Sequence, residues 1–398
     1  MLSGPRCDEL LSFCQALVRT PSLSGNEGNI AKLIANVART LGYDKIVVDS
    51  YGNVLLHMNF ASAGKKLLFH SQMDHVNPGK HTEWSFYPYG GQITNKRLYG
   101  SGVSDQKGAL AAMIQAGAYL KEDLGDKVPL AGELIIAAVV QQENFGGCSS
   151  RTIASSLMPD AVIAGESSNL TIVRGQRGRA KIILETLGRT AHTSYPERGI
   201  NAAENMLAVL KSLKDSYVMP EDPYLGKGDL VLTGLYTTPL VVDKAIPECC
   251  TAIFERKVLL REVAQDILDN FTSALGAEQI LERKLYKTSF AVNEGQCYTG
   301  APLVSEQFLP AWVEDEKTPF LQIVAEGVRK SGIPTQVADK PGLGTSGCIY
   351  AAEQGLPTLI FGPCRQDQPH SVDEYIELDH LFDACRAYYH IAEEFLRA

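Results

Sequence analysis

The sequence contains no Cys-x-x-Cys pair, no internal repeat, no low-complexity tract and no apolar run near the ~18 residues that a transmembrane helix needs. Its nine cysteines are scattered, and only Cys249 and Cys250 are adjacent. This distribution argues against a disulfide framework or a structural zinc knuckle and favours free thiols in a reducing compartment. Residues 1–18 lack the apolar core and the small-residue cleavage site of a signal peptide. We therefore expect a soluble, cytoplasmic protein.

Positive charge is also scarce. The 37 lysines and arginines are outnumbered by 46 aspartates and glutamates, which leaves a formal charge of −9 at pH 7. Broad binding to nucleic acid or to an anionic membrane is therefore a poor hypothesis, and a small-molecule or peptide partner fits better. Hydrophobic residues make up 45% and charged residues 21% of the chain, as in ordinary globular proteins. A length of 398 residues predicts two or three domains.

The order of apolar patterns predicts two kinds of domain. Up to about residue 175, and again from about 291, short apolar runs alternate with helical stretches, as in a mixed or parallel α/β sheet flanked by helices. Between them, the pattern of residues 176–290 predicts a strand, a helix, two strands, a helix and a strand, which together form a compact α+β unit. We predict an α/β domain formed by 1–175 and 291–398 and interrupted by a smaller α+β domain at 176–290.

Five short segments place polar residues at predicted strand ends or glycine-rich turns, where α/β sheets gather their functional groups. Each has a structural explanation when taken alone, such as a helix cap for Asp105 or a surface-loop histidine for His370. Together, Asp105, Glu143, Glu166 and His370 supply three carboxylates and an imidazole, which are ligands that zinc, manganese or cobalt accept. The segments are SQMD (71–74), GSGVSDQKG (100–108), QQENFGG (141–147), AGES (164–167) and FGPCRQDQPHSVDE (361–374).

These segments, in this order from PSLSGNE (21–27) to PHSVDE (369–374), resemble the co-catalytic zinc hydrolases. That family contains acetylornithine deacetylase, succinyl-diaminopimelate desuccinylase, aminoacylase and glutamate carboxypeptidase. The resemblance implies that Asp105 bridges two ions, that Glu143 and His370 complete one site, and that Glu166 belongs to the other. It implies one or two divalent ions, with zinc first and cobalt or manganese as alternatives.

The resemblance extends to the inserted unit, where RTAHTSYPERGINAAENM (189–206) is similar to the start of the family's lid and dimerisation domain. It implies that His192 helps to stabilise an oxyanion and that the protein is a homodimer. Asp74 matches the aspartate of the family's His-x-Asp motif, which implies a role at the catalytic centre. Polar side chains that could hold a substrate carboxylate are also retained, namely Arg256, Asn201, Thr345 and Ser346.

Two departures from the family pattern bear on the mechanism. Gln72 stands where the motif has a histidine ligand, and a neutral carboxamide is a much weaker ligand than imidazole. His70 or His75 could substitute for it, although two residues along a strand move a side chain by roughly 6–7 Å. Gln142 stands where the family has its general base, and an amide has no useful basicity. We therefore expect at most one tightly bound ion and weak ordinary hydrolysis.

Three hypotheses follow from this pattern. The first is a metal-dependent hydrolase of the amide bond in small N-acyl amino acids or peptides. The second is a catalytically impaired pseudoenzyme or small-molecule-binding protein on the same fold, which Gln72 and Gln142 favour. The third is a changed reaction, such as lyase or isomerase chemistry, in which another group moves the proton. Metal content and a panel of N-acyl amino acids and dipeptides distinguish the three.

Overall fold

A computed structural model describes residues 2, 4–60, 63–125, 127–238, 244–276 and 285–397. The chain divides into two compact units. Unit 1 comprises Met1–Gln176, Glu294–Ser305 and Trp312–Ala398, and unit 2 comprises Arg177–Asn293 and Glu306–Ala311. Unit 2 therefore contains the segment predicted as an insertion at 176–290 except Gln176, and it adds residues 291–293 and 306–311. The chain passes between the units within β15 (Val292–Gln296) and β16 (Pro302–Glu306).

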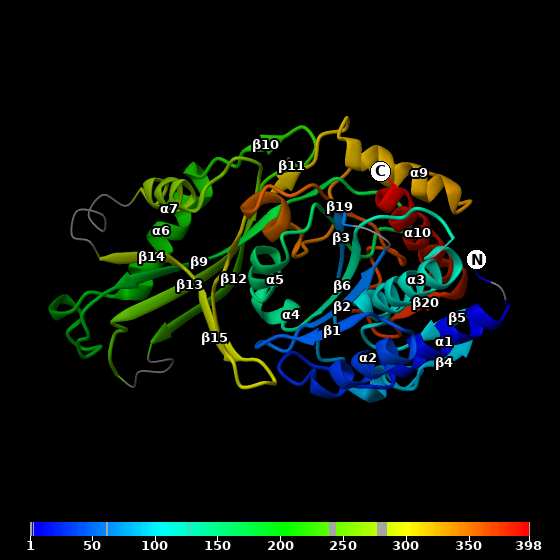
Figure 1. The fold of residues 1–398 in the computed structure, drawn as a ribbon. Coiled ribbons are helices and arrows are strands. Elements are labelled where there is room, and N and C mark those ends of the chain that lie inside the picture. The colour runs from blue at the N-terminus through cyan, green and yellow to red at the C-terminus, as the bar shows by residue number, and fades with distance from the viewer. Residues whose placement is uncertain are drawn as a thin grey trace. The chain divides into compact units, whose positions relative to one another are not determined.

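Unit 1 is built on a six-stranded mixed sheet (Figure 1). The sheet order is β1-β2-β6-β3-β7-β19. β6, β3, β7 and β19 run parallel to one another, and β1 and β2 are antiparallel to their neighbours. The prediction of a mixed α/β sheet is confirmed. The strands are β1 (Lys45–Val48), β2 (Val54–Asn59), β3 (Lys66–Gln72), β6 (Glu133–Val139), β7 (Ala161–Ala164) and β19 (Thr358–Ile360).

Helices cover both faces of this sheet. Successive residues of a strand point to opposite sides, so each strand packs against helices on both faces. On β3, the Phe69 ring contacts Tyr388 of α10, whereas the next residue, His70, contacts Tyr350 of the short helix η4 (Ile349–Glu353). Strand β3 is consequently buried along almost its whole length. The helices are α1 (Gly4–Val18), α2 (Gly28–Thr40), α3 (Gly108–Leu124), α4 (Gln142–Phe145), α5 (Ser150–Leu157), α9 (Pro319–Lys330) and α10 (Leu378–Arg397).

Short elements complete unit 1. A three-stranded sheet has the order β20-β5-β4, and β18 pairs with β8. The helical turn η2 leads directly into α3 and carries Asp105. The bounds are β4 (Gln92–Thr94), β5 (Arg97–Tyr99), β20 (Tyr375–Glu377), β8 (Gly175–Gln176), β18 (Trp312–Val313), η1 (His81–Glu83) and η2 (Val103–Lys107).

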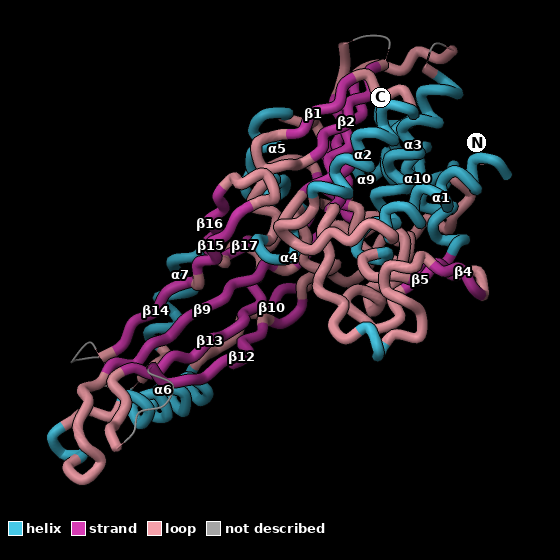
Figure 2. The backbone as a smooth tube through the Cα atoms, turned by 90° about the horizontal axis from the view of Figure 1, so that it is seen from below, coloured by secondary structure: helices cyan, strands magenta, loops and turns pink. Residues whose placement is uncertain are grey.

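In the described residues of unit 2, the main sheet is antiparallel and packs against helices α6 and α7. Figure 2 shows β9, β12, β13 and β14 side by side, in the order β12-β13-β9-β14, and β17 also pairs with β9. Alternate residues of β9 are buried, and Ile182 and Leu184 share a core with Met206 of α6 and Phe271 of α7. The elements are β9 (Gly178–Leu187), η3 (Pro196–Arg198), α6 (Ala202–Ser216), β10 (Glu221–Asp222), β11 (Gly226–Lys227), β12 (Asp229–Thr238), β13 (Cys249–Val258), α7 (Ala264–Ser273), β14 (Tyr286–Phe290) and β17 (Phe308–Leu309).

The predicted strand–helix–strand–strand–helix–strand order of the inserted segment is therefore present in unit 2. All nine cysteines carry free thiols. In the part of the chain that the structure describes, every helix is too short or too polar to cross a lipid bilayer.

Candidate metal centre

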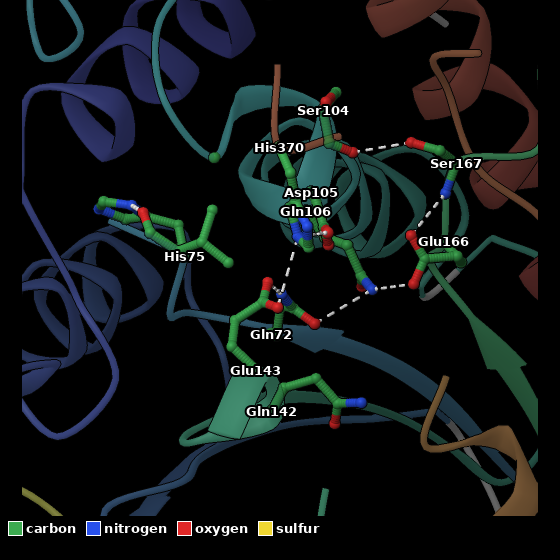
Figure 3. A network of polar contacts seen from close by, with 12 residues as sticks. Gln72, His75, Ser104, Asp105, Gln106, Gln142, Glu143, Glu166, Ser167 and His370 are labelled. Atoms are coloured by element: carbon green, nitrogen blue, oxygen red, sulfur yellow. Dashed lines mark hydrogen bonds and ion pairs between the residues drawn. The ribbon is translucent and has the colours of Figure 1, made fainter. Parts of the chain in front are cut away.

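The parallel strands of unit 1 bring the predicted ligands to one edge of the sheet, because the carboxyl ends of parallel strands meet there. Gln72 is the last residue of β3, Glu143 lies in α4 just after β6, and Glu166 follows β7 by two residues. His370 lies in the loop after β19, and Asp105 lies in η2. Five segments that are far apart in the sequence thus meet in one place (Figure 3).

Asp105, Glu143 and His370 form a tight cluster, since one ligand atom from each lies within 4.8 Å of the others. His370 Nε2 is 3.2 Å from Asp105 Oδ2 and 3.4 Å from Glu143 Oε2. These two carboxylates raise the pKa of His370 to about 10, against the opposing effect of its partial burial. Two carboxylates and an imidazole in this arrangement are a three-ligand set for a divalent ion.

One oxygen in the cluster lacks the partner that burial demands. Asp105 Oδ1 is buried, and among the described residues no group donates a hydrogen bond to it. Burial, opposed mainly by His370, raises the pKa of this carboxyl group. Buried polar atoms are normally satisfied, so an orphaned carboxylate oxygen beside two further ligands indicates the place of a cation. The residues present therefore fit one divalent ion.

Two backbone conformations support this edge of the sheet. His370 has a φ of 62° and Gln141 a φ of 58°, in the left-handed region that residues other than glycine rarely adopt. Such residues cost free energy and collect at functional sites, where the surrounding structure holds them. Here they turn the chain immediately before α4 and in the loop that carries the histidine ligand.

Gln72 contacts the cluster through a hydrogen bond from its amide nitrogen. Its Nε2 donates to Glu143 Oε1 at 2.7 Å. Neither nearby histidine takes its place. His70 Nδ1 is 3.1 Å from Tyr350 Oη, and burial lowers the pKa of His70 to about 3. His75 Nε2 accepts from the Ser22 amide, and its Nδ1 donates to the Val76 carbonyl oxygen.

Asp74 fixes the start of α4 behind the cluster. Its two oxygens accept from the backbone N–H groups of Gln142 and Glu143, both at 3.1 Å, and Ser24 Oγ donates to it at 2.7 Å. Burial raises the pKa of Asp74 to about 7, with a further contribution from the Glu143 carboxylate. Asp74 thus orients Gln142 and Glu143, a contact that the sequence pattern did not predict.

Gln142 contacts Ser346, one of the residues predicted to bind a substrate carboxylate. Ser346 Oγ donates a hydrogen bond to Gln142 Oε1. The contact requires Gly147, which has a φ of 78°, because a Cβ atom there would lie 2.0 Å from Ser346 Oγ. Thr345 is engaged differently, since its hydroxyl donates to Gln176 Oε1 at 2.7 Å. Ser346 therefore lies at the site, whereas Thr345 holds a buried glutamine.

Glu166 lies outside the three-ligand cluster. Its Oε2 accepts a hydrogen bond of 2.7 Å from Gln106 Nε2, and its Oε1 accepts from the Ser167 amide at 3.1 Å. Burial raises the pKa of Glu166, and the nearby Asp105 raises it further. Gln106 is the functional neighbour that the sequence analysis missed. The available signal was a second amide directly after Asp105, in the segment SDQKG.

The remaining predicted residues belong to unit 2. His192 is exposed, and its Nδ1 accepts from the Ser194 amide at 3.1 Å. Asn201 caps α6 by accepting from the Ala203 amide. Arg256 is only 2% exposed, and its guanidinium donates two hydrogen bonds to Glu262, at 2.9 and 2.6 Å. The carboxylate that Arg256 binds in this structure is thus one from its own chain.

Comparison with known proteins gives consistent results. A family model described as "Peptidase family M20/M25/M40" matches residues 68–394. An uncharacterized protein, YgeY, from Escherichia coli strain K12 is 29% identical over 386 residues, which cover 96% of this chain and 93% of that protein. Succinyl-diaminopimelate desuccinylase from Paracoccus denitrificans is 27% identical over 394 residues, with 95% and 96% coverage. Among solved structures, the Bacillus subtilis YxeP protein, described as a dinuclear metal-binding peptidase, superposes with a TM-score of 0.72 at 14% identity and covers both chains completely.

Proposed function

Because this chain belongs to peptidase family M20/M25/M40, we propose that it uses a divalent metal ion to hydrolyse the amide bond of small N-acyl amino acids or peptides. The observation that carries the proposal is the cluster of Asp105, Glu143 and His370 with its orphaned buried oxygen. Relatives named as a desuccinylase and as an acetylornithine deacetylase support the N-acyl amino acid class. Solved structures described as a tripeptidase and a carboxypeptidase support short peptides.

The chain's own residues divide the work as follows. Asp105, Glu143 and His370 would hold the ion, and their oxygen and nitrogen donors suit zinc, cobalt or manganese. When bound, such an ion polarises a substrate carbonyl and lowers the pKa of water. Asp74 holds the backbone of α4 in place. With its Oε1 accepting from Ser346, Gln142 can offer its amide N–H groups to a substrate oxygen, but it can neither take up nor release a proton.

A binding role without turnover is the second candidate, and the carboxamide of Gln142 favours it. General acid–base help typically contributes about 10²–10⁴-fold in rate, and Gln142 cannot supply it. A protein of this kind would still bind an ion and a carboxylate-bearing ligand. Calorimetric binding of an N-acyl amino acid that the ion-loaded protein does not cleave would support this second candidate over hydrolysis.

Metal dependence tests the proposed hydrolysis directly. After removal of ions with a chelator, we expect the rate on a panel of N-acyl amino acids and dipeptides to fall by about 100-fold or more, because the carbonyl loses its Lewis acid. Zinc, cobalt or manganese should restore it, as measured by amine release. Asp105→Asn should abolish the restoration, whereas the exposed Asp367→Asn should leave it intact. Hydrolysis that is indifferent to the chelator, or absent from every substrate, would contradict the proposal.

We further propose that the protein is a homodimer that associates through unit 2. β12 pairs with β13 on one side only within the described residues, and its exposed apolar side chains are Val231, Leu232, Leu235 and Tyr236. An exposed apolar edge strand readily pairs with another chain. Light scattering should give twice the chain mass, and the double variant Val231→Glu with Leu235→Glu should give the monomer mass. The control Val218→Glu, at an exposed position of the same unit, should stay dimeric. A monomeric native protein would refute this proposal.

A further inference from the structure

The side chain of Gln106 occupies the part of the centre that Gln72 and Glu166 face. Its Nε2 donates to Glu166 Oε2 at 2.7 Å and to Gln72 Oε1 at 3.4 Å (Figure 3). All three side chains are buried, with 2% exposure for Gln72 and 4% each for Gln106 and Glu166. A single nitrogen therefore donates to oxygens from β3 and from the segment just after β7.

The hydrogen-bond network determines which way both amides point. A carboxylate at Glu166 can only accept, so the NH₂ group of Gln106 faces it, and Ser71 Oγ donates to Gln106 Oε1 at 3.0 Å. Gln72 Nε2 donates to Glu143 Oε1, so the oxygen of Gln72 must face Gln106. Every donor in this chain meets an acceptor. The orientation therefore rests on four hydrogen bonds rather than on the placement of one amide.

The same position is where a second ion would have to lie. The family resemblance assigns that ion to residues 72, 105 and 166, and zinc–oxygen bonds are about 2.0–2.2 Å long. A nitrogen within hydrogen-bond distance of both Gln72 Oε1 and Glu166 Oε2 leaves no room for a cation bonded to the same atoms. Its N–H groups also supply the positive partial charge that a buried carboxylate requires.

We propose that the Gln106 carboxamide takes the place of the second ion, so that the centre binds one divalent ion per chain. Glu166 is then a hydrogen-bond acceptor rather than a metal ligand, and the ion-binding set is Asp105, Glu143 and His370. This inference rests on the proposed function for that one ion. It also gives Gln72 a role, because Gln72 accepts from Gln106 and donates to Glu143.

The two explanations for a missing second ion, a weak ligand at Gln72 and occupation by Gln106, predict different results. If the weak ligand at position 72 were the only obstacle, Gln72→His alone would create a second site. If Gln106 fills the position, Gln72→His should still bind one ion, whereas Gln72→His combined with Gln106→Met should bind two. Methionine is close to glutamine in length and removes the donor, and Gln106→Ala provides a smaller replacement in case methionine does not fit.

Ion stoichiometry can be measured without any assay of activity. Native mass spectrometry of cobalt-loaded protein counts ions per chain, and electron paramagnetic resonance of manganese-loaded protein detects coupling within an ion pair. We expect one ion in the native protein and in Gln72→His, and two in the double variant. The control Gln72→His with Gln115→Met removes a different buried glutamine, in α3, and should bind one ion.

Each outcome discriminates. Two tightly bound ions in the native protein, or two in Gln72→His alone, would overturn the inference and leave the proposed function standing. The inference would also be overturned if the two double variants, Gln72→His with Gln106→Met and Gln72→His with Gln106→Ala, both fold and each binds only one ion. No bound ion in the native protein would overturn the proposed function and the inference with it.

Discussion

Replacing Gln142 with glutamate is expected to raise the rate of amide hydrolysis by about 100-fold or more. A carboxylate at this position lies beside Glu143 and can take up and return the proton that an amide cannot, and such help is typically worth about 10²–10⁴-fold. The exchange is nearly isosteric, and the glutamate oxygen can accept from Ser346 as the amide oxygen does. The measurement is kcat/KM on the best substrate of the panel, with zinc, cobalt or manganese loaded.

The added negative charge needs its own control. Gln366→Glu places the same charge at an exposed position of the loop that carries His370, and it should leave the rate within about twofold. A well-folded Gln142→Glu variant that binds the ion but gains no hydrolysis on any substrate would contradict the hydrolase hypothesis. The missing base would then not be the obstacle, and the binding role would become the better account.

The sheet of unit 1 could be predicted because strands buried on both faces have continuous apolar sequences. Residues 67–69 of β3 and 134–139 of β6 are examples. The same reasoning fails for β17, which contains only Phe308 and Leu309. Two residues are too few to show a period, so the sequence pattern cannot reveal that Phe308 and Leu309 pair with β9 or that residues 306–311 belong to unit 2.

The ligand cluster could be predicted only in part. Strand ends place Gln72, Glu143 and Glu166 on one edge, which follows from the parallel order of β3, β6 and β7. The contact between Gln106 and Glu166 could not be predicted. The segment SDQKG indicates the start of a helix, where neighbouring side chains point about 100° apart. The backbone instead departs from helical angles at Asp105 (φ −134°, ψ 84°) and at Gln106 (φ −133°, ψ 28°). These angles set the directions of the two side chains.

Arg256 shows a different limit of sequence reasoning. Its chemistry alone predicts that this arginine of the inserted segment holds a substrate carboxylate. Its partner is Glu262, which lies six residues later, beyond the end of β13 at Val258. The chain must reverse between them for the pair to form, and no periodic pattern marks that reversal. Burial is what distinguishes such a structural pair from a free substrate-binding arginine.

Replacing His370 with alanine is expected to weaken ion binding by at least about 100-fold, since even the loss of a group behind a ligand typically costs about 10–100-fold. The native affinity should also depend strongly on pH. His370 has a pKa of about 10 in the ion-free protein, above its usual 6.5, and must be neutral to bind a metal. Below pH 10, ion binding therefore displaces its proton. The association constant should fall about tenfold for each pH unit lowered.

The raised pKa of His370 also makes the stability of the ion-free fold depend on pH. The contacts of the protonated imidazole stabilise that fold fully below pH 6.5, and this contribution is lost as the pH rises through about 10. Calorimetry in buffers of different ionisation enthalpy counts the released protons, and we expect His370→Ala to release about one fewer than the native protein. His380→Ala, which removes a histidine from α10, should leave both affinity and proton release unchanged. Equal proton release by the native protein and His370→Ala would exclude His370 as a ligand, because a ligand imidazole cannot keep the proton that its two carboxylate neighbours hold there.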